Sequence, residues 1–299
     1  MKLINQSAEI WQQEPNEMGI YKQIEKAARL CYRSGDKITD DSYRHFIEML
    51  DNNGHLSPYE HGTVYLKIPF IIPDDLRVKW YSNSPYSWVV IPDDDTRTAY
   101  ITTNYRVIKE NGLEDDLEFL CEPTKYHHKR ISVHITTSLG ISRELNRHRC
   151  HSICEESTRY CNYSKDKFGN ELTFIKPNWF NAPVGEYELY EDDDTLEGLD
   201  VYLIDDSKNP LMELTNAEKA FIRNCDDAER NYLEAIKDGW KPQQARDVLP
   251  LATKTELVHT AFEDDWQTFF KLRCSPAAHP MMQELANMIK ELMCKNDKV

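Results

Sequence analysis

The pattern of hydrophobic and polar positions predicts β-strands in two parts of the chain. Alternate positions of residues 62–71 are apolar, which is the period of a strand that buries one face. The buried face is expected to carry Val64, Leu66, Ile68 and Phe70. Residues 131–137 are rich in β-branched side chains, which favour strands. The short segment 158–163 fits either a strand or a loop.

Helical spacing and helix-boundary residues predict helices between these strands. Thr215 and Glu218 have the spacing of a capping box, because each side chain can satisfy a backbone group near the other. The helix that they begin is expected to end near Asp238, before Gly239. Apolar spacing predicts further helices over residues 21–31, 40–52 and 139–147, and Pro242 is expected to open a short one through Arg246.

The C-terminal part of the chain predicts two more helices. One covers residues 262–273 and faces inward with Trp266, Phe269 and Phe270. The other begins at Pro280, and its core stripe is expected to be Met281, Leu285, Met288 and Leu292. Strands and helices mix without a βαβ repeat, which indicates an α+β fold. The chain has neither G-x-G-x-x-G nor G-x-x-x-x-G-K-[ST], so a Rossmann or P-loop nucleotide site has no support.

Composition narrows the class of protein. The chain has 299 residues, of which 40% are hydrophobic, enough for one large domain or two small ones. Its formal net charge is −15. An acidic surface repels phosphate backbones, so general nucleic-acid binding is not expected, although a small anion can still bind in a local basic pocket.

The cysteines and the N-terminus indicate a soluble, cytoplasmic protein with reduced thiols. The eight cysteines are scattered, and residues 1–10 lack the basic start and apolar core of a signal peptide. No stretch approaches the roughly 20 apolar residues of a membrane span. Membrane partners are therefore not expected.

The segment 183–209 is strongly acidic, and Lys208 is its one lysine. Such blocks usually stay solvated. We expect an exposed surface insertion here, with an interaction surface as the alternative.

The densest chemistry lies in residues 143–160, which hold four arginines in an acidic protein. Arginine presents a planar fork of donors that suits phosphate and carboxylate groups. One alternative is a surface helix whose arginines pair with Glu144, Glu155 and Glu156. A zinc site is disfavoured because no C-x-x-C pair is present, and a cysteine nucleophile is disfavoured because most cysteines are small buried residues. The residues alone leave these alternatives open.

Within this cluster the string Arg147-His148-Arg149, seven intervening residues and then Ser157 resembles the signature of the flavin-dependent thymidylate synthases. Arg159 and Tyr160 continue the match. Further segments resemble the family in the same order: residues 28–34, residues 55–61, Ala245-Arg246-x-x-Leu249-Pro250, residues 266–273 and Ala278-His279-Pro280. The resemblance spans roughly residues 27–292 and leaves the acidic segment outside.

The resemblance implies an enzyme that methylates dUMP to dTMP. Methylenetetrahydrofolate would be the carbon donor, and FAD reduced by NADPH would supply the hydride. The implied fold is a single α+β catalytic domain over residues 1–299, with a central, mostly antiparallel sheet flanked by helices. The implied assembly is a homotetramer whose active sites are shared between subunits.

The resemblance also implies roles for individual residues. Flavin contacts are expected from Ser34, Ser57, Arg147, His148, Arg149, Glu155 and Thr268. Contacts with dUMP are expected from Glu144, Arg147, Glu155, Glu156, Ser157, Arg159, Arg246 and Arg273. Arg273 and Ser157 are the implied catalytic residues, and no metal is implied.

The implied role of Arg273 makes chemical sense. A cation beside the uracil amide stabilises the enolate that develops when the ring carbon becomes nucleophilic. Arginine stays protonated and therefore acts as an electrophile. The plainer alternative for Arg246 and Arg273 is a cation at a helix end. For Ser157 we favour a binding and polarising hydroxyl, and for His55 and His61 a structural role.

The sequence departs from the family pattern at several positions. Cys154 stands where many members have Asn, and Glu144 stands where many have Gln. An ionised Glu144 cannot donate a hydrogen bond, which changes its expected contact with dUMP. Phe262 and Thr268 stand where some members have Asn. Two other functions stay open: modification of another pyrimidine nucleotide, and non-catalytic binding of a nucleotide or a metal.

Overall fold

A central four-stranded sheet organises the chain. The computed structural model describes residues 1–299 apart from 71–75, 95–96, 166–170, 192–198, 204–213 and 297–299. The central sheet has the order β2-β6-β11-β7, and each neighbouring pair is antiparallel. Its strands are β2 (Ser7–Trp11), β6 (Arg130–Ser138), β11 (Lys254–Phe262) and β7 (Ser152–Glu155). The predicted α+β fold with a central antiparallel sheet is confirmed.

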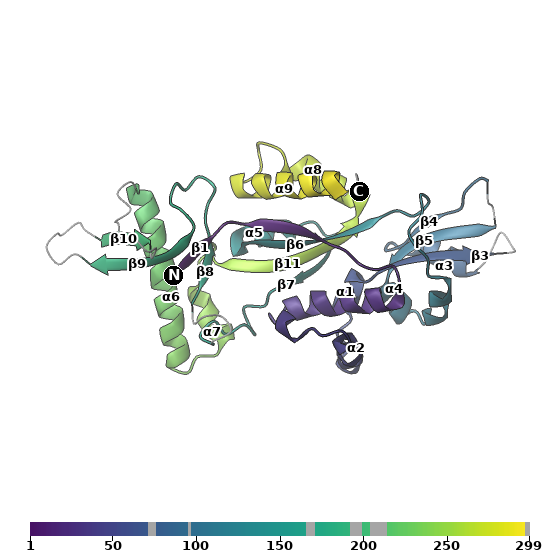
Figure 1. The fold of residues 1–299 in the computed structure, drawn as a ribbon, viewed down its shortest axis with the longest axis horizontal. Coiled ribbons are helices and arrows are strands. Elements are labelled where there is room, and N and C mark those ends of the chain that lie inside the picture. The colour runs from purple at the N-terminus through teal and green to yellow at the C-terminus, as the bar shows by residue number, and fades with distance from the viewer. Residues whose placement is uncertain (71–75, 95–96, 166–170, 192–198, 204–213, 297–299) are drawn as a thin grey trace.

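Smaller sheets extend the molecule at both ends of its long axis (Figure 1). At one end β1 pairs in parallel with β8 and antiparallel with β9, which also pairs with β10. At the other end β5 lies between β3 and β4. These strands are β1 (Lys2–Ile4), β3 (Thr63–Pro69), β4 (Trp88–Val90), β5 (Thr98–Asn104), β8 (Thr173–Ile175), β9 (Gly185–Glu191) and β10 (Leu199–Leu203).

Helices cover the sheets. They are α1 (Glu17–Leu30), α2 (Ser42–Asn52), α3 (Leu76–Asn83), α4 (Tyr105–Glu110), α5 (Leu139–Leu145), α6 (Asn216–Lys237), α7 (Pro242–Ala245), α8 (Glu263–Arg273) and α9 (Pro280–Asn296). Short 3₁₀ turns are η1 (Gly35–Lys37), η2 (Ser57–His61), η3 (Glu114–Phe119) and η5 (Arg246–Val248). In the described part of the chain, no helix has the length and apolar composition that a bilayer crossing needs.

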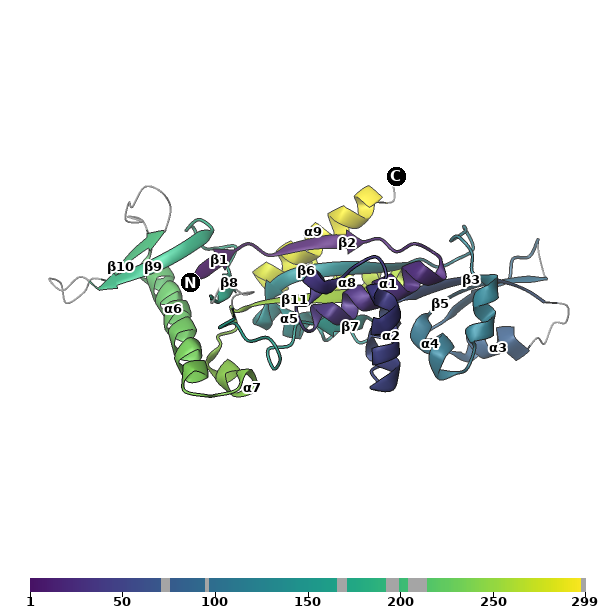
Figure 2. The same cartoon turned by 60° about the horizontal axis from the view of Figure 1, so that its bottom comes forward.

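The two faces of the central sheet have different neighbours (Figures 1 and 2). On one face Val133, Ile135 and Leu257 pack against Trp266 of α8 and Leu285 of α9. On the other face Trp11, Cys154 and Val258 pack against Ala27 and Leu30 of α1. Because successive strand residues point to opposite faces, neighbouring residues of one strand enter different layers. We call these layers the α8 face and the α1 face.

Several predicted elements are confirmed. The predicted strand at residues 62–71 buries Val64, Leu66, Ile68 and Phe70. Thr215 and Glu218 form both bonds of the capping box at the start of α6. Beyond its end, Gly239 has a φ of 94°, a left-handed conformation that glycine adopts without strain. The segment 158–163 is a loop of turns.

The predicted stripe of α9 is partly wrong. Met281 and Leu285 are buried, but Met288 and Leu292 are only half-buried. The buried positions are Met281, Met282, Leu285, Ala286, Ile289 and Met293. The helix therefore buries the row spaced by four residues, because it rests on the sheet along that ridge.

The prediction that residues 183–209 are an acidic surface insertion stays a prediction, but the segment includes paired strands and one buried side chain. Its first half forms β9, which pairs with both β1 and β10. Tyr187 is 1% exposed and belongs to the core that also contains Leu3 and Phe174. The backbone pairing and this buried ring outweigh the acidic composition. Residues 192–198 and 204–209 lie outside the described residues.

The corrected α9 stripe can be tested by two alanine variants. Ile289→Ala is expected to lower the free energy of unfolding by about 2–5 kcal/mol, because it leaves a cavity in the core. Met288→Ala, one position away on the half-buried side, is expected to lower it by about 1 kcal/mol. Urea unfolding followed by circular dichroism measures both, and equal losses would contradict the placement.

Candidate functional site

The basic motif lies in the turn between α5 and β7. The helix ends at Leu145, earlier than the predicted Arg147, and Asn146 is its C-cap. Arg147 and Arg149 are exposed, whereas His148 is half-buried. Neither arginine side chain has a hydrogen bond or ion pair with any residue that the structure describes, although the Arg147 amide donates to the Glu144 carbonyl at 3.3 Å. Their guanidinium groups therefore keep their donors for a ligand.

Arg273, the last residue of α8, joins this turn from far away in the sequence. Its Nη1 donates to Glu144 Oε2 at 2.8 Å, and its Nη2 donates to the Glu144 carbonyl oxygen at 2.9 Å. Its Nε donates to His148 Nε2 at 3.0 Å. The side chain is only 15% exposed. A carboxylate at position 144 therefore has a clear partner, since it accepts where arginine donates.

His148 is a neutral ring in this arrangement. Burial, together with the charge of Arg273, lowers its pKa to about 4. Because Nε2 accepts the bond from Arg273, the ring proton lies on Nδ1. His148 thus positions Arg273 without adding a second cation to the site.

A second group of residues forms around the loop that follows β7. We call residues 157–160 the Ser157 loop. The Ser157 amide donates to the Cys31 carbonyl at 3.0 Å, which ties the loop to the end of α1. Arg246 Nη1 donates to Thr158 Oγ1 at 3.3 Å, across 88 residues of sequence. Arg159 and Tyr160 are exposed on the same loop. The structure therefore brings Arg246 to the loop that carries Ser157 and Arg159. The resemblance implied that all three contact dUMP, but it did not show that they lie together.

Glu155 and Glu156, adjacent in sequence, point to opposite faces of the sheet. Glu155 accepts from Asn146 Nδ2 at 3.0 Å and from Thr255 Oγ1 at 3.2 Å, so it links the basic turn to β11 on the α8 face. Glu156 turns to the α1 face, where its side chain is fully buried. The alternation of a strand explains this divergence.

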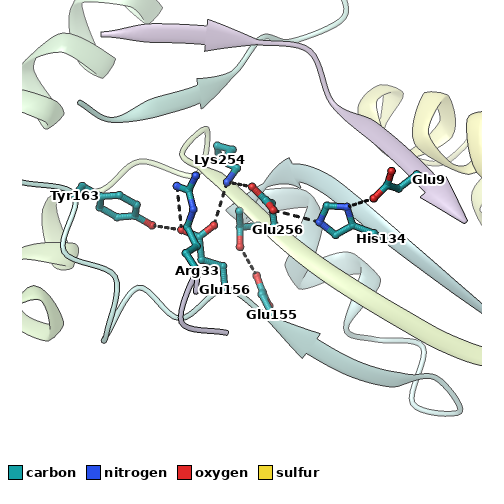
Figure 3. Close-up of polar contacts among 9 residues, drawn as sticks. Glu9, Arg33, His134, Glu155, Glu156, Tyr163, Lys254 and Glu256 are labelled. Carbon is teal, nitrogen blue, oxygen red and sulfur yellow. Dashed lines mark hydrogen bonds and ion pairs between the residues drawn. The ribbon is translucent and has the colours of Figure 1, made fainter. Parts of the chain in front are cut away.

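The buried carboxylate of Glu156 is held by several partners (Figure 3). Lys254 Nζ donates to it at 3.1 Å and Tyr163 Oη donates at 3.1 Å. An Arg33 nitrogen lies 3.8 Å away. The Glu156 amide also donates to the Glu256 carbonyl at 2.7 Å. Glu156 thus anchors the Ser157 loop to the sheet, and its expected contact with dUMP stays a prediction.

The polar network continues across the α1 face (Figure 3). Lys254 also pairs with Glu256, which His134 joins to Glu9 through bonds of 3.2 Å on each side. Burial of Glu256 opposes its ionisation, but the hydrogen bond from His134 and the charge of Lys254 outweigh burial and lower its pKa to about 2. Glu256 is therefore ionised throughout the physiological range.

Two open cavities flank this network. Arg33 and Glu256 line both of them. The cavity of about 520 Å³ is also lined by Trp11 and Lys26, and the cavity of about 850 Å³ is also lined by Lys2 and Glu186. The α1 face therefore stays open to a ligand beyond the end of α1.

The remaining predicted flavin contacts divide between the two faces. Ser34 follows α1, where its Oγ donates to the Arg29 carbonyl at 3.5 Å, and Ser57 is exposed at the start of η2. Thr268 is exposed on α8, where its Oγ1 donates to the Asp264 carbonyl. Among the described residues, no hydrogen bond joins Ser34 or Ser57 to the turn that carries Arg147 to Arg149.

Three histidines form a buried cluster that sequence reasoning missed in part. His61 Nδ1 lies 2.8 Å from Thr260 Oγ1, and the Nδ1 atoms of His151 and His259 lie 3.2 Å apart. Burial is the main cause that lowers the pKa of His61 and of His151 to about 3 each. These neutral rings fit a structural role, as expected for His61. Within the described residues, no group of three or more His, Cys, Asp or Glu side chains could hold a metal ion.

Sequence reasoning also missed Lys254 and Glu256. Both lie on one face of β11, two positions apart, and Arg33 reaches the same network from the end of α1. Lysine and glutamate at alternate positions of an otherwise mostly apolar segment were the available indication.

Comparison with known proteins places the chain in a family. A family model described as thymidylate synthase complementing protein matches residues 121–296. This span holds the basic turn, the Ser157 loop, Arg246 and Arg273, and it covers more than half of the chain. The chain therefore belongs to this family, and the resemblance stated from the motif is confirmed.

Three relatives of the chain carry the name flavin-dependent thymidylate synthase. The flavin-dependent thymidylate synthase of Aquifex aeolicus is 22% identical over 323 residues, which cover 92% of this chain and 95% of that protein. The enzyme of the same name from Pyrococcus furiosus is 26% identical over 205 residues, or 66% of this chain and 69% of that protein. That of Synechocystis is 25% identical over 171 residues, or 56% and 66%.

The buried ion pair can be tested by removing its cation. Lys254→Met is expected to lower the free energy of unfolding by about 3–5 kcal/mol, because the buried Glu156 carboxylate loses its closest charge partner. The double variant with Glu156→Leu is expected to recover most of that loss. Lys2→Met, which breaks an exposed pair with Glu186, is the control and should cost at most about 1 kcal/mol. A Lys254→Met protein as stable as the control would contradict the assignment.

The protonation state of His148 can be tested by NMR. Its C2 proton is expected to titrate with a midpoint of about 4, and Arg273→Met should raise that midpoint toward the ordinary 6.5. The folded pKa lies below the unfolded value, so the unfolded state binds a proton first as the pH falls from 6.5 to 4. The contribution of His148 should therefore lower the free energy of unfolding as the pH falls through that window. A wild-type midpoint near 6.5 would refute the neutral ring.

Proposed function

We propose that this protein is a flavin-dependent thymidylate synthase. It would methylate dUMP to dTMP with methylenetetrahydrofolate as carbon donor and with FAD, reduced by NADPH, as hydride source. The observation that carries the proposal is the convergence of Arg273, Glu144 and His148 in a family member. We also propose that residues 1–299 act as one catalytic domain.

The basic turn fits the pyrophosphate of FAD. Arg147 and Arg149 are exposed and keep their donors among the described residues, and the charged fork of arginine suits phosphate oxygens. His148, Glu155 and Thr268 lie on the same α8 face and would complete this half of the flavin site. When bound, FAD would carry the reducing electrons that the methylation needs.

The division of the predicted flavin contacts supports an assembly with shared sites. Ser34 and Ser57 belong to the α1 side, whereas Arg147 to Arg149 and Thr268 belong to the α8 side. One flavin can contact both sets when one chain supplies the first set and a neighbouring chain supplies the second. We therefore propose a homotetramer with active sites shared between subunits.

The Ser157 loop fits the nucleotide phosphate. Arg159 is exposed, Arg246 is held against Thr158, and the half-buried Ser157 offers a hydroxyl on the same loop. Two arginines and a hydroxyl match the charge and the acceptors of a phosphate group. The carboxylate of Glu156 is fully buried and engaged by Lys254 and Tyr163, so it is poorly placed to act as a base for Ser157. This supports a binding and polarising role for Ser157.

Arg273 would act on the uracil ring. A cation beside the ring amide stabilises the enolate that forms as the ring carbon attacks the one-carbon donor. Glu144 holds two of its nitrogens and His148 holds the third, so the guanidinium is oriented before the substrate arrives. Preorganised charge of this kind lowers the barrier because nothing has to rearrange during the reaction.

The proposal is tested on the purified protein with dUMP, methylenetetrahydrofolate and NADPH. The expected result is a yellow protein with flavin absorbance that forms dTMP. If the mixture gives NADPH oxidation without dTMP, and another pyrimidine nucleotide is methylated, that nucleotide and not dUMP is the substrate. A colourless protein that binds zinc stoichiometrically would overturn the proposal.

Arg273→Ala tests the role of that side chain. The variant is expected to lower the rate of dTMP formation by at least about 10²–10³-fold while flavin stays bound through Arg147 and Arg149. Lys271→Ala, an exposed cation in the same last turn of α8, should retain activity. Loss of flavin absorbance in Arg273→Ala, or equal activity in both variants, would show that Arg273 has been misassigned.

A further inference from the structure

Two cysteines from different parts of the chain meet beside the Ser157 loop. Cys31 caps the C-terminus of α1, and Cys154 lies in β7, three residues before Ser157. Cys154 faces α1 because it is opposite Val258 in the sheet, and both belong to the cluster that packs against Leu30. Cys31 packs against the same cluster. Both cysteines are free thiols, not joined in a disulfide.

We propose that Cys31 and Cys154 are a redox-sensitive modification site, at which hydrogen peroxide converts the two thiols into a reversible disulfide. The effect of this bond on catalysis rests on the proposed function, but the site itself does not.

The two thiols are chemically unequal. Cys31 is partly exposed, and the hydrogen bond from the Cys154 thiol lowers its pKa in spite of burial. Cys154 is 5% exposed, and its bond to Cys31 together with burial raises its pKa. The accessible sulfur with the lower pKa is the nucleophile, since the thiolate is the reactive form. Cys154 is then placed to resolve the oxidised product.

The chemistry balances with the peroxide as the named oxidant. The Cys31 thiolate attacks one peroxide oxygen, the O–O bond breaks, and the departing hydroxide takes a proton to give water and a Cys31 sulfenic acid. The Cys154 sulfur then attacks the Cys31 sulfur, the S–O bond breaks, and a second water leaves with the Cys154 proton. Two thiols are oxidised by two electrons, and the peroxide is reduced to water.

The bond would act on the loop that binds the nucleotide. The Cys31 carbonyl already accepts the Ser157 amide, and Arg33, two residues further on, reaches the Glu156 carboxylate. A covalent link between α1 and β7 fixes the separation of these two segments. The position of Ser157 depends on both, so we expect the oxidised protein to form dTMP more slowly.

The site is tested by mapping disulfides after treatment with hydrogen peroxide. The full-length protein is oxidised, its remaining thiols are alkylated, and its unreduced peptides are analysed by mass spectrometry. The expected product joins the peptides of Cys31 and Cys154 and disappears after dithiothreitol. In Cys154→Ser the cross-link should be absent and dimedone should trap a sulfenic acid on Cys31. Cys225→Ser, which changes another buried cysteine, should keep the cross-link.

Two results would overturn the site. One is a wild-type protein in which Cys31 is oxidised without any link to Cys154. The other is a cross-link that joins Cys31 to a different cysteine, such as the exposed Cys150.

The coupling to the loop is tested by activity. The rate of dTMP formation should fall in proportion to the cross-linked fraction, return after dithiothreitol, and stay insensitive to peroxide in Cys154→Ser. Unchanged activity in the fully cross-linked protein would overturn the coupling. If the protein formed no dTMP under any condition, the proposed function would fail while the disulfide map still decided the site.

Discussion

The pairing of β7 with β11 determines where the residues of the basic motif and its following loop are placed. This edge strand has only four residues, and Glu155 lies opposite Leu257 while Ser152 lies opposite Thr260. With this register Glu155 reaches Asn146 on the α8 face and Glu156 reaches Lys254 on the α1 face. A slip by one residue would exchange the two faces, and both glutamates would lose their partners. Short strands specify register weakly by themselves, so the side-chain contacts of these glutamates also stabilise the pairing.

The buried ion pair of Glu156 and Lys254 fits a role in specifying this strand register better than a role in net stability. Removing two charges from water costs about as much as their attraction returns, so such pairs add little net stability. A buried ion pair does disfavour every arrangement in which one of its charges is buried alone, because an unpaired buried charge is costly. Tyr163 and Arg33 add further bonds to the same carboxylate, which makes the native position of the Ser157 loop the arrangement that satisfies all of these groups.

Local patterns in the sequence predicted what depends on neighbours along the chain. The alternation in residues 62–71 and the capping box at Thr215 depend on spacings of a few residues, and both are confirmed. The resemblance supplied the expected residues of the site, but not their partners. Arg273 meets Glu144 across 129 residues, and Arg246 meets Thr158 across 88. No local pattern contains such contacts, since they follow from the packing of α8 against β11 and of α7 against α6. The burial of Tyr187 was missed for the same reason, because pairing with β1 outweighs the acidic composition around it.

The two partners of Arg273 have different electrostatic effects on its cation. Glu144 orients the guanidinium strongly, but its negative charge offsets part of the field that a developing enolate would experience. His148 orients the third nitrogen as a neutral acceptor and takes nothing from that field. The three bonds use Nε and one hydrogen on each terminal nitrogen, so the second hydrogens of Nη1 and Nη2 remain as donors. Glutamate at position 144 therefore trades some charge for a fixed direction of these donors. In the proposed reaction that exchange would favour catalysis when the ring oxygen binds in line with them, because hydrogen-bond strength falls steeply with misalignment.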